Sequence, residues 1–457
     1  MALQDGVDTP EGVFSLLDTD LYKLTMQAAV LKYYPKIPVT YQFTNRTPHM
    51  RLTHAAYTWL QAQIQKLENI TVTDEEIAWL KKKCDYLPES YFEYLRGFRL
   101  YPQEQVKLSF KSVSSGDLTD STPGDIDLSI QGLWSETILY EIPLLALTSE
   151  AYFKFVDRDW NHNGQIEKAK DKGLKLLEAG CVFSEFGSRR RRDYKTHKMV
   201  LQGLMEARKD AEKYPEWTGK LTGTSNVHMA KQYDLDPIGT VAHEWFMGIA
   251  AITQDYANAN DKAMQQWIGT FGPGVLGIAL TDTFGTPSFL KAFKRPPPKS
   301  SDTDDVDWNQ PSYAQLFNGV RQDSGDPLDY VRMMRTFYDS QGIKDKKIVV
   351  FSDSLNIERC IKYKEATEEA GLTPSFGIGT FFTNDFWHQN ENKKSVPLNI
   401  VIKLSQANGY NAIKLSDDKG KNMGNEELMR SVKEQVGYQE KEWEGGDEAH
   451  RWDKNDE

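Results

Sequence analysis

The chain has 457 residues, of which 39% are hydrophobic and 26% charged, and its formal net charge is -11 at pH 7. This length suffices for two or three domains, or for one barrel with additions. The acidic balance disfavours a nucleic-acid-binding protein, since such proteins present basic surfaces to the phosphate backbone. No stretch approaches the roughly 18 apolar residues of a membrane span, so we expect no membrane partner.

The N-terminus and the cysteines bear on the compartment. The first 20 residues have neither a basic start nor an apolar core, so they do not resemble a secretory signal. Cys84, Cys181 and Cys360 lack CxxC spacing, which argues against a disulfide framework and against a zinc site. We expect a cytoplasmic protein with reduced thiols, and a nuclear location is compatible with these features.

The first 147 residues predict a mixed α/β domain. Residues 16–32 carry apolar residues at helical spacing behind an Asp/Thr start, which predicts an N-capped helix with an exposed first turn. The β-branched and aromatic residues of 37–47 predict a strand. Residues 53–100 look helical, and residues 105–147 are expected to form strands of a small sheet.

From residue 148 the pattern changes to repeated pairs of a strand and a helix. Seven short buried-strand segments each end in Gly, Ser, Thr, Asp or Asn and precede a helical stretch. Seven such units predict a closed or nearly closed parallel α/β barrel over 148–394, with the polar strand ends around one pocket. We expect the C-terminal segment 395–457 to join the N-terminal domain. The strand segments are GCVFSEFGS, LTGTSNVHMA, PIGTVAHEW, GVLGIALTDT, QLFNGVRQDSGDP, KKIVVFSDSLN and SFGIGTFFTN.

Two stretches are expected to lie outside this core. Residues 293–311 are rich in Pro and Asp and predict an exposed excursion with little order. Residues 437–457 are charged and contain Gly, which is typical of a flexible tail.

The segment SEFGSRRRRDY (184–194) places four arginines, Arg189–Arg192, in a row. A solvated basic face or a nuclear-targeting run would account for them, and so would a site for a phosphorylated ligand. Adjacent helical side chains point about 100° apart, so Arg190–Arg192 cannot all share one pocket with Arg189. The contacts of these three arginines therefore stay open.

Polar residues at the later strand ends predict the chemistry. SDSLN (352–356) and GIGTFFTND (377–385) place Gly, Ser and Thr where backbone N–H groups can hold a phosphate, although tight turns without a ligand look the same. In RQDSGDP (321–327), Asp323 could hold ribose hydroxyls or Mg²⁺, and Arg321 could pair with an anion. The alternative there is an Asp-rich helix cap.

His243, in AHEW, is a candidate catalytic residue. A histidine behind a buried strand is more often structural than catalytic. If Asp282 from another strand end accepts one imidazole N–H, however, the second nitrogen is left as a nucleophile or base. HExxH and HxxEH spacings are absent, so we expect no metal site built on histidine.

Taken in order, these motifs resemble the nicotinate phosphoribosyltransferase family, and the match is close to its fungal members. The resemblance implies a type II phosphoribosyltransferase fold, in which an irregular α/β barrel packs on a mixed α/β N-terminal domain, and a homodimer with shared active sites. It implies transfer of phosphoribosyl from phosphoribosyl pyrophosphate to nicotinate in NAD salvage, coupled to ATP hydrolysis with Mg²⁺ bound through substrate phosphates. The motifs, spanning residues 16 to about 385, are LLDTDLYKLTMQ, YQFTNRT, EIPLLAL, SEFGSRRRRDY, GTSNV, PIGTVAHEW, LTDTFGT, RQDSGDP, FSDSLN and GIGTFFTND.

The resemblance also implies roles for individual residues. His243 matches the histidine that family members phosphorylate, and Asp282 matches the carboxylate that orients it. Phe186 aligns with the aromatic residue that stacks on the pyridine ring, and Tyr22 with one that approaches from the second subunit. The remaining implied residues are Arg189, Arg321 and Asp323 in the substrate site, Ser352, Asp353, Gly379 and Thr380 in the phosphate loops, and Lys403 and Lys414 in a region of phosphate-binding lysines.

The turn Gly223–Asn226 bears on which pyridine is bound. Relatives that use nicotinamide resemble this chain but carry an acidic residue in this turn, where it accepts from the amide N–H₂. An Asp there would repel a carboxylate, whereas Ser225 and backbone N–H groups can donate to one. Nicotinate is therefore favoured.

Three alternatives stay open. Another pyridine phosphoribosyltransferase would act on nicotinamide or on quinolinate, and the latter reaction would release CO₂. An RNA-binding protein would use Arg189–Arg192, although an overall basic domain and a recognisable aromatic platform are missing. A barrel without catalysis would serve as a scaffold.

Overall fold

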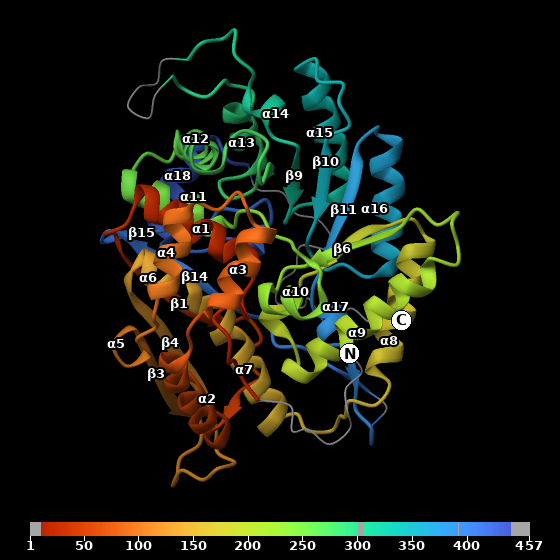
Figure 1. Cartoon of the computed structure of the whole chain (residues 1–457). Coiled ribbons are helices and arrows are strands. Elements are labelled where there is room, and N and C mark those ends of the chain that lie inside the picture. Colours follow the sequence, from red (N-terminus) through yellow and green to blue (C-terminus); the bar gives the residue numbers. More distant parts are fainter. Residues whose placement is uncertain (1–10, 300–305, 392, 440–457) are drawn as a thin grey trace.

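The computed structural model describes residues 11–299, 306–391 and 393–439, and two β-sheets organise them (Figure 1). Within these ranges, none of the helices has the length and apolar character needed to cross a membrane. All three cysteines are buried and free. The middle of the predicted excursion, 300–305, and most of the predicted tail, 440–457, lie outside the described residues.

The first sheet is antiparallel and combines both ends of the chain. β14, from the C-terminal part, pairs with β1 in register from Ile400 opposite Asn45 to Ala407 opposite Val39. Figure 1 shows this blue strand among the red and orange elements of the N-terminal part. The strand order is β15 (Tyr410–Asn411), β14 (Ile400–Ala407), β1 (Pro38–Asn45), β4 (Pro123–Leu133) and β2 (Leu52–Thr53), with β3 (Val106–Ser112) paired to β4.

The second sheet is parallel and contains all seven predicted strands. Because the last strand of the series, β11, pairs with the first, β5, the strands curve into a ring. The ring is open at one place, since no pairing joins β7 to β8 within the described residues. This confirms the prediction of a nearly closed barrel. The order is β7 (Asp236–Pro237), β6 (Lys220–Thr224), β5 (Val182–Glu185), β11 (Thr373–Ile378), β10 (Ile348–Phe351), β9 (Gly319–Gln322) and β8 (Ile278–Leu280).

Two expectations about the N-terminal part are wrong. Residues 134–147 are helical rather than extended, because α6 (Trp134–Thr137) and α7 (Glu141–Phe155) follow β4. Thirteen of the fifteen residues of α7 are buried, so the helix has no solvent-facing polar side and no amphipathic period that would reveal it. In addition, α1 (Leu21–Tyr33) begins later than expected, and its first turn is buried instead of exposed.

The remaining helices, 3₁₀ turns and short strands complete the described part of the chain. The helices are α2 (His54–Lys66), α3 (Asp74–Lys83), α4 (Glu89–Gly97), α5 (Pro102–Gln105), α8 (Gln165–Glu178), α9 (Tyr194–Ala211), α10 (Val227–Tyr233), α11 (His243–Thr253), α12 (Ala259–Phe271), α13 (Thr286–Phe293), α14 (Tyr313–Leu316), α15 (Pro327–Ser340), α16 (Ile357–Glu369), α17 (Thr380–Thr383) and α18 (Glu426–Val436). The 3₁₀ turns are η1 (Leu67–Asn69), η2 (Ile138–Tyr140), η3 (Ser188–Arg190) and η4 (Lys419–Lys421), and the strands β12 (Phe386–Trp387) and β13 (Lys394–Ser395) form a hairpin.

The buried first turn of α1 is held by an ion cluster. Lys23 is 0% exposed and pairs with Glu141 of α7 at 2.5 Å and with Glu244 of α11. Glu244 also accepts from the Tyr41 hydroxyl at 2.5 Å and from Trp134 Nε1 at 2.7 Å. A buried lysine is tolerated only with such partners, so this cluster ties α1 to α7 and to the helix that begins with His243.

Candidate active site

A cavity of about 1200 Å³ runs along the inside of the barrel to its strand ends, since the first residues of β5, β8, β10 and β11 line it as well. Its walls come from the turns after the parallel strands, from the start of α1 and from the C-terminal segment that contains β14. Asp282 and Ser225 are not among the lining residues. Of the predicted residues, those that line it are Tyr22, Phe186, Arg189, His243, Arg321, Asp323, Ser352, Asp353, Gly379, Thr380, Lys403 and Lys414.

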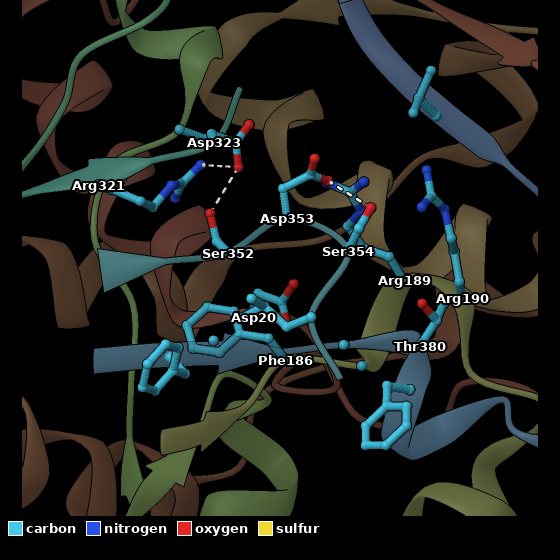
Figure 2. Close-up of a pocket in the computed structure, with 18 of the residues that line it drawn as sticks. Asp20, Phe186, Arg189, Arg190, Arg321, Asp323, Ser352, Asp353, Ser354 and Thr380 are labelled. Atoms are coloured by element: carbon cyan, nitrogen blue, oxygen red, sulfur yellow. Dashed lines mark hydrogen bonds and ion pairs between the residues drawn. The ribbon is translucent and has the colours of Figure 1, made fainter. Parts of the chain in front are cut away.

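Phe186 follows directly on β5 and is fixed to the neighbouring strand β11. Its backbone N–H donates to the Ile378 carbonyl at 2.7 Å. A Cβ at Gly377 would lie 3.3 Å from the Phe186 ring, so glycine leaves room beneath it. Figure 2 shows Phe186 in the cavity next to Asp20 and below Ser352 and Asp353. The ring is thus available to a flat ligand.

Tyr22 lies in the cavity of its own chain, contrary to the expectation that a second subunit supplies it. The start of α1 is pinned to the turn after β6, since the Leu21 N–H donates to the Ser225 carbonyl at 2.8 Å. Arg189 forms a hydrogen bond with Tyr22, and burial raises the pKa of the Tyr22 hydroxyl well above its usual value. One chain therefore brings both aromatic residues to the cavity.

Ser225 is completely buried, and its hydroxyl donates to Asp20 Oδ1 at 2.7 Å. The donor expected for a substrate carboxylate is therefore already engaged, and it lies behind the cavity wall. Asp20 lines the cavity and was not singled out from the sequence. Burial raises its pKa to about 6, against the opposing hydrogen bonds of Ser188 and Ser225 and the charge of Arg189.

Two arginines of the run hold the C-terminal segment. Arg190 donates to the Ile400 carbonyl at 3.1 and 3.2 Å and to Asn399 Oδ1 at 2.9 Å. Arg192 donates to Ser395 Oγ at 2.9 Å, and its guanidinium carbon lies 3.6 Å from the ring centre of Phe153. Arg190 also lines the cavity.

The other two arginines face the N-terminal part. Both terminal nitrogens of Arg191 donate to Asp18, at 2.8 and 2.7 Å. Arg189 lies 3.9 Å from Glu141 and lines the cavity. Since Arg190, Arg191 and Arg192 are at most 8% exposed, the run is neither a solvated face nor a surface that RNA could reach.

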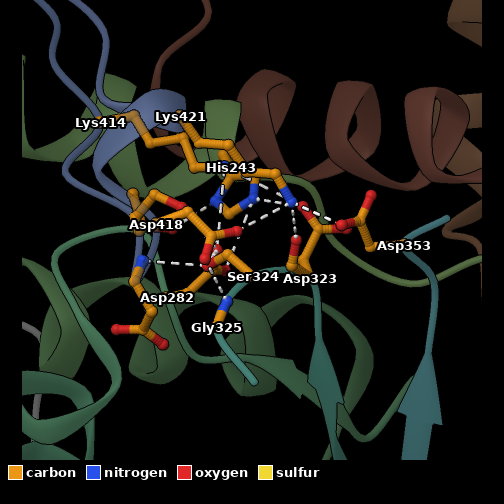
Figure 3. Close-up of polar contacts among 12 residues, drawn as sticks. His243, Asp282, Asp323, Ser324, Gly325, Asp353, Lys414, Asp418 and Lys421 are labelled. Atoms are coloured by element: carbon orange, nitrogen blue, oxygen red, sulfur yellow. Dashed lines mark hydrogen bonds and ion pairs between the residues drawn. The ribbon is translucent and has the colours of Figure 1, made fainter. Parts of the chain in front are cut away.

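His243, the first residue of α11, has a partner on each ring nitrogen (Figure 3). Nδ1 lies 3.0 Å from Thr283 Oγ1, while Nε2 lies 3.0 Å from Asp323 Oδ2 and 3.5 Å from Asp282 Oδ1. The sequence named Asp282 as the orienting carboxylate, whereas Asp323 is the nearer one here, and the second nitrogen has Thr283 as its neighbour. Burial lowers the pKa of His243 to about 4, although both carboxylates oppose this, so the ring is neutral at pH 7.

A C-terminal loop brings cations to this histidine. Lys414 lies 3.8 Å from Asp282 and 4.0 Å from Asp323. Lys421 donates to the Asp323 carbonyl at 2.9 Å and to Asp353 Oδ2 at 2.7 Å. Lys421 was missed from the sequence, since its partners lie 98 and 68 residues away.

The predicted phosphate loops are in contact with this group. Ser352 Oγ donates to Asp323 Oδ1 at 2.9 Å. Gly379 precedes α17, and a Cβ there would lie 3.2 Å from the Phe186 carbonyl, so the turn approaches the Phe186 backbone closely. Lys403 of β14 lines the same cavity, where burial lowers its pKa to about 7 against the charge of Glu141. Anionic and aromatic ligand groups could thus be bound together.

The residues also fit a divalent cation. Three potential ligand atoms lie within 4.8 Å of one another, one each from His243, Asp282 and Asp323. Asp282 Oδ1 is buried without a hydrogen-bond partner among the described residues. Mg²⁺ prefers oxygen ligands, so the two carboxylates fit it better than the imidazole does.

A nearly closed parallel barrel with a histidine, carboxylates and cations around one cavity defines an α/β-barrel enzyme that acts on an anionic substrate. Residues 17–149 match the N-terminal domain of nicotinate phosphoribosyltransferases, and residues 181–440 match the nicotinate phosphoribosyltransferase family. The chain belongs to this family, as the sequence motifs predicted.

Individual relatives agree with this assignment. A Schizosaccharomyces pombe protein that bears the family name is 48% identical over 426 residues, covering 93% of this chain and 98% of that protein. The nicotinate phosphoribosyltransferase of Saccharomyces cerevisiae is 46% identical over 446 residues, covering 96% and 98%. A crystal structure from Saccharomyces cerevisiae assigned to the same activity superposes with a TM-score of 0.86 at 45% identity, covering 94% of this chain and 100% of that one.

Proposed function

We propose that this member of the nicotinate phosphoribosyltransferase family transfers the phosphoribosyl group of phosphoribosyl pyrophosphate to the ring nitrogen of nicotinate. The products are nicotinate mononucleotide and diphosphate, a step of NAD salvage, and the transfer is coupled to ATP hydrolysis through phosphorylation of His243. The observation that carries the proposal is that one cavity contains a neutral buried histidine, the carboxylates of Asp323 and Asp353, and the aromatic ring of Phe186. The family assignment agrees with it.

The substrate groups can be matched to residues of the cavity. Phe186 and Tyr22 supply aromatic faces for the pyridine ring. Aromatic side chains have few rotatable bonds, so they bind a flat ring at low entropic cost. Arg321 supplies a donor for an anionic group, because its Nε is buried and has no hydrogen-bond partner among residues 11–299, 306–391 and 393–439. Arg189 adds a second guanidinium in the same cavity. Two guanidinium groups favour nicotinate over the neutral nicotinamide.

His243 can accept a phosphoryl group because its imidazole is unprotonated. The unprotonated ring nitrogen attacks the γ-phosphorus of ATP and ADP leaves, while the proton on Nε2 passes to the Asp323 carboxylate 3.0 Å away. The added negative charge is placed beside two carboxylates, so Lys414 and Lys421 are needed to offset it. Asp323 and Asp282 would hold Mg²⁺ together with substrate oxygens, and the ion would neutralise charge that develops on the diphosphate.

The proposal is tested by incubating the protein with labelled ATP, Mg²⁺, phosphoribosyl pyrophosphate and either nicotinate, nicotinamide or quinolinate. We expect nicotinate mononucleotide and ADP only with nicotinate. Product from nicotinamide alone, or CO₂ from quinolinate, would identify another pyridine phosphoribosyltransferase. No product with any pyridine would support a scaffold.

We also propose a cytoplasmic homodimer, as in the family. Because Tyr22 already lies in the cavity of its own chain, the dimer is not required to deliver this residue. Sedimentation equilibrium measures the oligomeric state, and activity at concentrations where only monomer is present would show whether the sites are shared.

The low pKa of His243 predicts the acid limb of its phosphorylation. Because its pKa is about 4, His243 becomes protonated only when the pH falls towards this value, whereas the pKa of an ordinary histidine is 6.5. At pH 5.5 we therefore expect the rapid burst of ADP to keep nearly all of its rate at pH 7, about 97%, against roughly one-tenth for an unshifted histidine. Quenched-flow measurement between pH 4 and 7.5 tests this, with circular dichroism as the control for folding. An acid limb near pH 6.5 would contradict it.

Replacing Phe186 by leucine is expected to raise the KM for nicotinate by about 3- to 10-fold, because aromatic pairs contribute beyond their buried area. The KM for phosphoribosyl pyrophosphate should change less than twofold. Steady-state kinetics with each substrate varied in turn measures both. Phe14→Leu is the matched control, since this ring is 39% exposed and lies outside the cavity. An unchanged KM for nicotinate would refute the stacking role.

A further inference from the structure

Behind the aromatic part of the cavity lies a chain of buried polar side chains that the proposed reaction does not use. Each member is at most 2% exposed, and none lines the cavity. We call this chain the relay, and its members are Asp18, Arg191, His197 and Glu185.

The relay begins at the N-terminal segment. Arg191 binds Asp18 through two parallel hydrogen bonds, at 2.8 and 2.7 Å. Asp18 Oδ1 also accepts from Asn226 Nδ2 at 2.7 Å, and the same nitrogen lies 3.2 Å from Ser188 Oγ. Although burial opposes ionisation, the charge of Arg191 holds the pKa of Asp18 below its usual value. A bidentate pair of this kind fixes orientation as well as distance.

The relay continues through His197 of α9 to the end of β5. Nδ1 of His197 lies 3.5 Å from Arg191 Nη1, and Nε2 lies 2.8 Å from Glu185 Oε2. Glu185 also accepts from the Thr224 hydroxyl at 2.6 Å and from the Gly187 N–H. One carboxylate therefore joins α9, the end of β6 and the turn after β5.

The two ends of the relay are adjacent to the two aromatic residues of the cavity. Glu185 immediately precedes Phe186, and it holds the turn that follows this ring. That turn has little freedom, since a Cβ at Gly187 would lie 2.2 Å from Thr383 Oγ1. At the other end, Asp18 precedes α1, and Tyr22 lies four residues later in the first turn of this helix. The relay thus connects the backbone on both sides of the proposed pyridine site.

We propose that the relay is a positioning device for pyridine binding, which holds the Phe186 turn and the start of α1 in fixed register. Its members are positioning residues, since they act through Phe186 and Tyr22 and do not touch substrate. Apart from Arg191 Nε, the buried polar side-chain atoms of the relay have hydrogen-bond partners, and a buried polar network with such partners specifies one arrangement. The inference rests on the proposed function, because it assigns the aromatic site to nicotinate. Loss of one relay contact should therefore weaken nicotinate binding and leave the His243 group intact.

The test compares Glu185→Gln with the wild-type full-length protein. The amide of glutamine keeps the shape of the side chain but lacks the negative charge of the carboxylate. It therefore accepts hydrogen bonds from His197 and Thr224 less strongly. We expect the dissociation constant for nicotinate, measured by calorimetry, to rise about 10- to 100-fold, the range in which misplaced site geometry acts. The labelling of His243 by ATP without nicotinate should stay within twofold of wild type. Thr224→Val removes one donor to Glu185 and the acceptor of the Asn226 N–H, keeps the Glu185 charge, and should give a smaller rise.

Asp261→Asn is the matched control. Asp261 is also a buried carboxylate, with Tyr313 at 2.8 Å and Arg295 at 2.9 Å, and it does not line the cavity. It should lower thermal stability without changing nicotinate affinity. Arg191→Lys should retain more affinity than Arg191→Met, because it keeps the charge beside Asp18. Equal losses of nicotinate binding and of His243 labelling, or a relay variant with unchanged nicotinate affinity, would overturn the proposal.

The wild-type arm separates this inference from the proposed function. A wild-type protein that binds nicotinate but forms no nucleotide would contradict the reaction, while the binding comparison would still decide the role of the relay. A wild type that does not bind nicotinate would overturn both.

Discussion

Replacing His243 by alanine is expected to abolish the transfer of labelled phosphate from ATP to the protein and to uncouple ATP from phosphoribosyl transfer. No other group is proposed to accept the phosphoryl group, so ADP formation should fall by about 10³-fold or more, the order seen when a catalytic nucleophile is removed. Nucleotide formation with ATP should drop to the rate seen without ATP. Denaturing the labelled protein in detergent at alkaline pH measures the first effect, because phosphohistidine is acid-labile and survives under these conditions.

A histidine outside the cavity serves as the control. His54 begins α2 and packs against the ring of Phe110 at 5.5 Å, and His54→Ala should be labelled as wild type is. Asp323→Asn offers a second check, since its carboxylate is the nearer partner of His243. It should slow labelling while leaving the site of modification unchanged. Full ATP coupling in His243→Ala would rule out the phosphohistidine.

Replacing Lys23 by methionine is expected to destabilise the protein by about 3–5 kcal/mol, because it leaves two buried carboxylates without their cation. Glu141 and Glu244 would then face each other in a site with almost no solvent. Urea unfolding followed by tryptophan fluorescence measures the change. The double variant Lys23→Met/Glu141→Gln should recover part of the loss, since one unpaired charge is removed.

The exposed pair of Lys81 and Glu89 provides the comparison. Lys81→Met should cost at most about 1 kcal/mol, as is usual for surface ion pairs. The pH dependence should differ as well. Burial opposes ionisation of Glu141, but the charges of Lys23, Lys403 and Arg189 lower its pKa to about 2. Its contribution is therefore complete above its ordinary pKa of 4.5 and is lost as the pH falls towards 2. Equal losses in the Lys23 and Lys81 variants would contradict the buried-cluster account.

The parallel barrel was predictable because each of its strands carries a local signal. The segment IVVF (348–351), for example, is a short run rich in β-branched residues that Ser352 and Asp353 follow, and it forms β10. Polar residues at such ends meet in space whenever the strands are parallel, so Asp323 and Ser352 could be assigned to one site. The structure brings them within 2.9 Å.

The parts that could not be predicted depend on distant contacts. Arg190 binds a carbonyl 210 residues away, and nothing around it in the sequence indicates that partner. Ser225 looked like a free donor because its neighbour Asp20 lies 205 residues earlier in the chain. Helix α7 was missed for another reason, since complete burial removes the polar face from which a helical period is recognised.

The sheet formed from both ends of the chain has a consequence for synthesis. About 355 residues separate the end of β1 at Asn45 from the start of β14 at Ile400. At about 5–20 residues per second, the ribosome needs roughly 20–70 s to add them. During this interval the edge of β1 has no β14 to pair with and is open to association with other chains. The cavity wall that carries Lys403 is also missing until then, so the enzyme can acquire its site only after β14 has been synthesised.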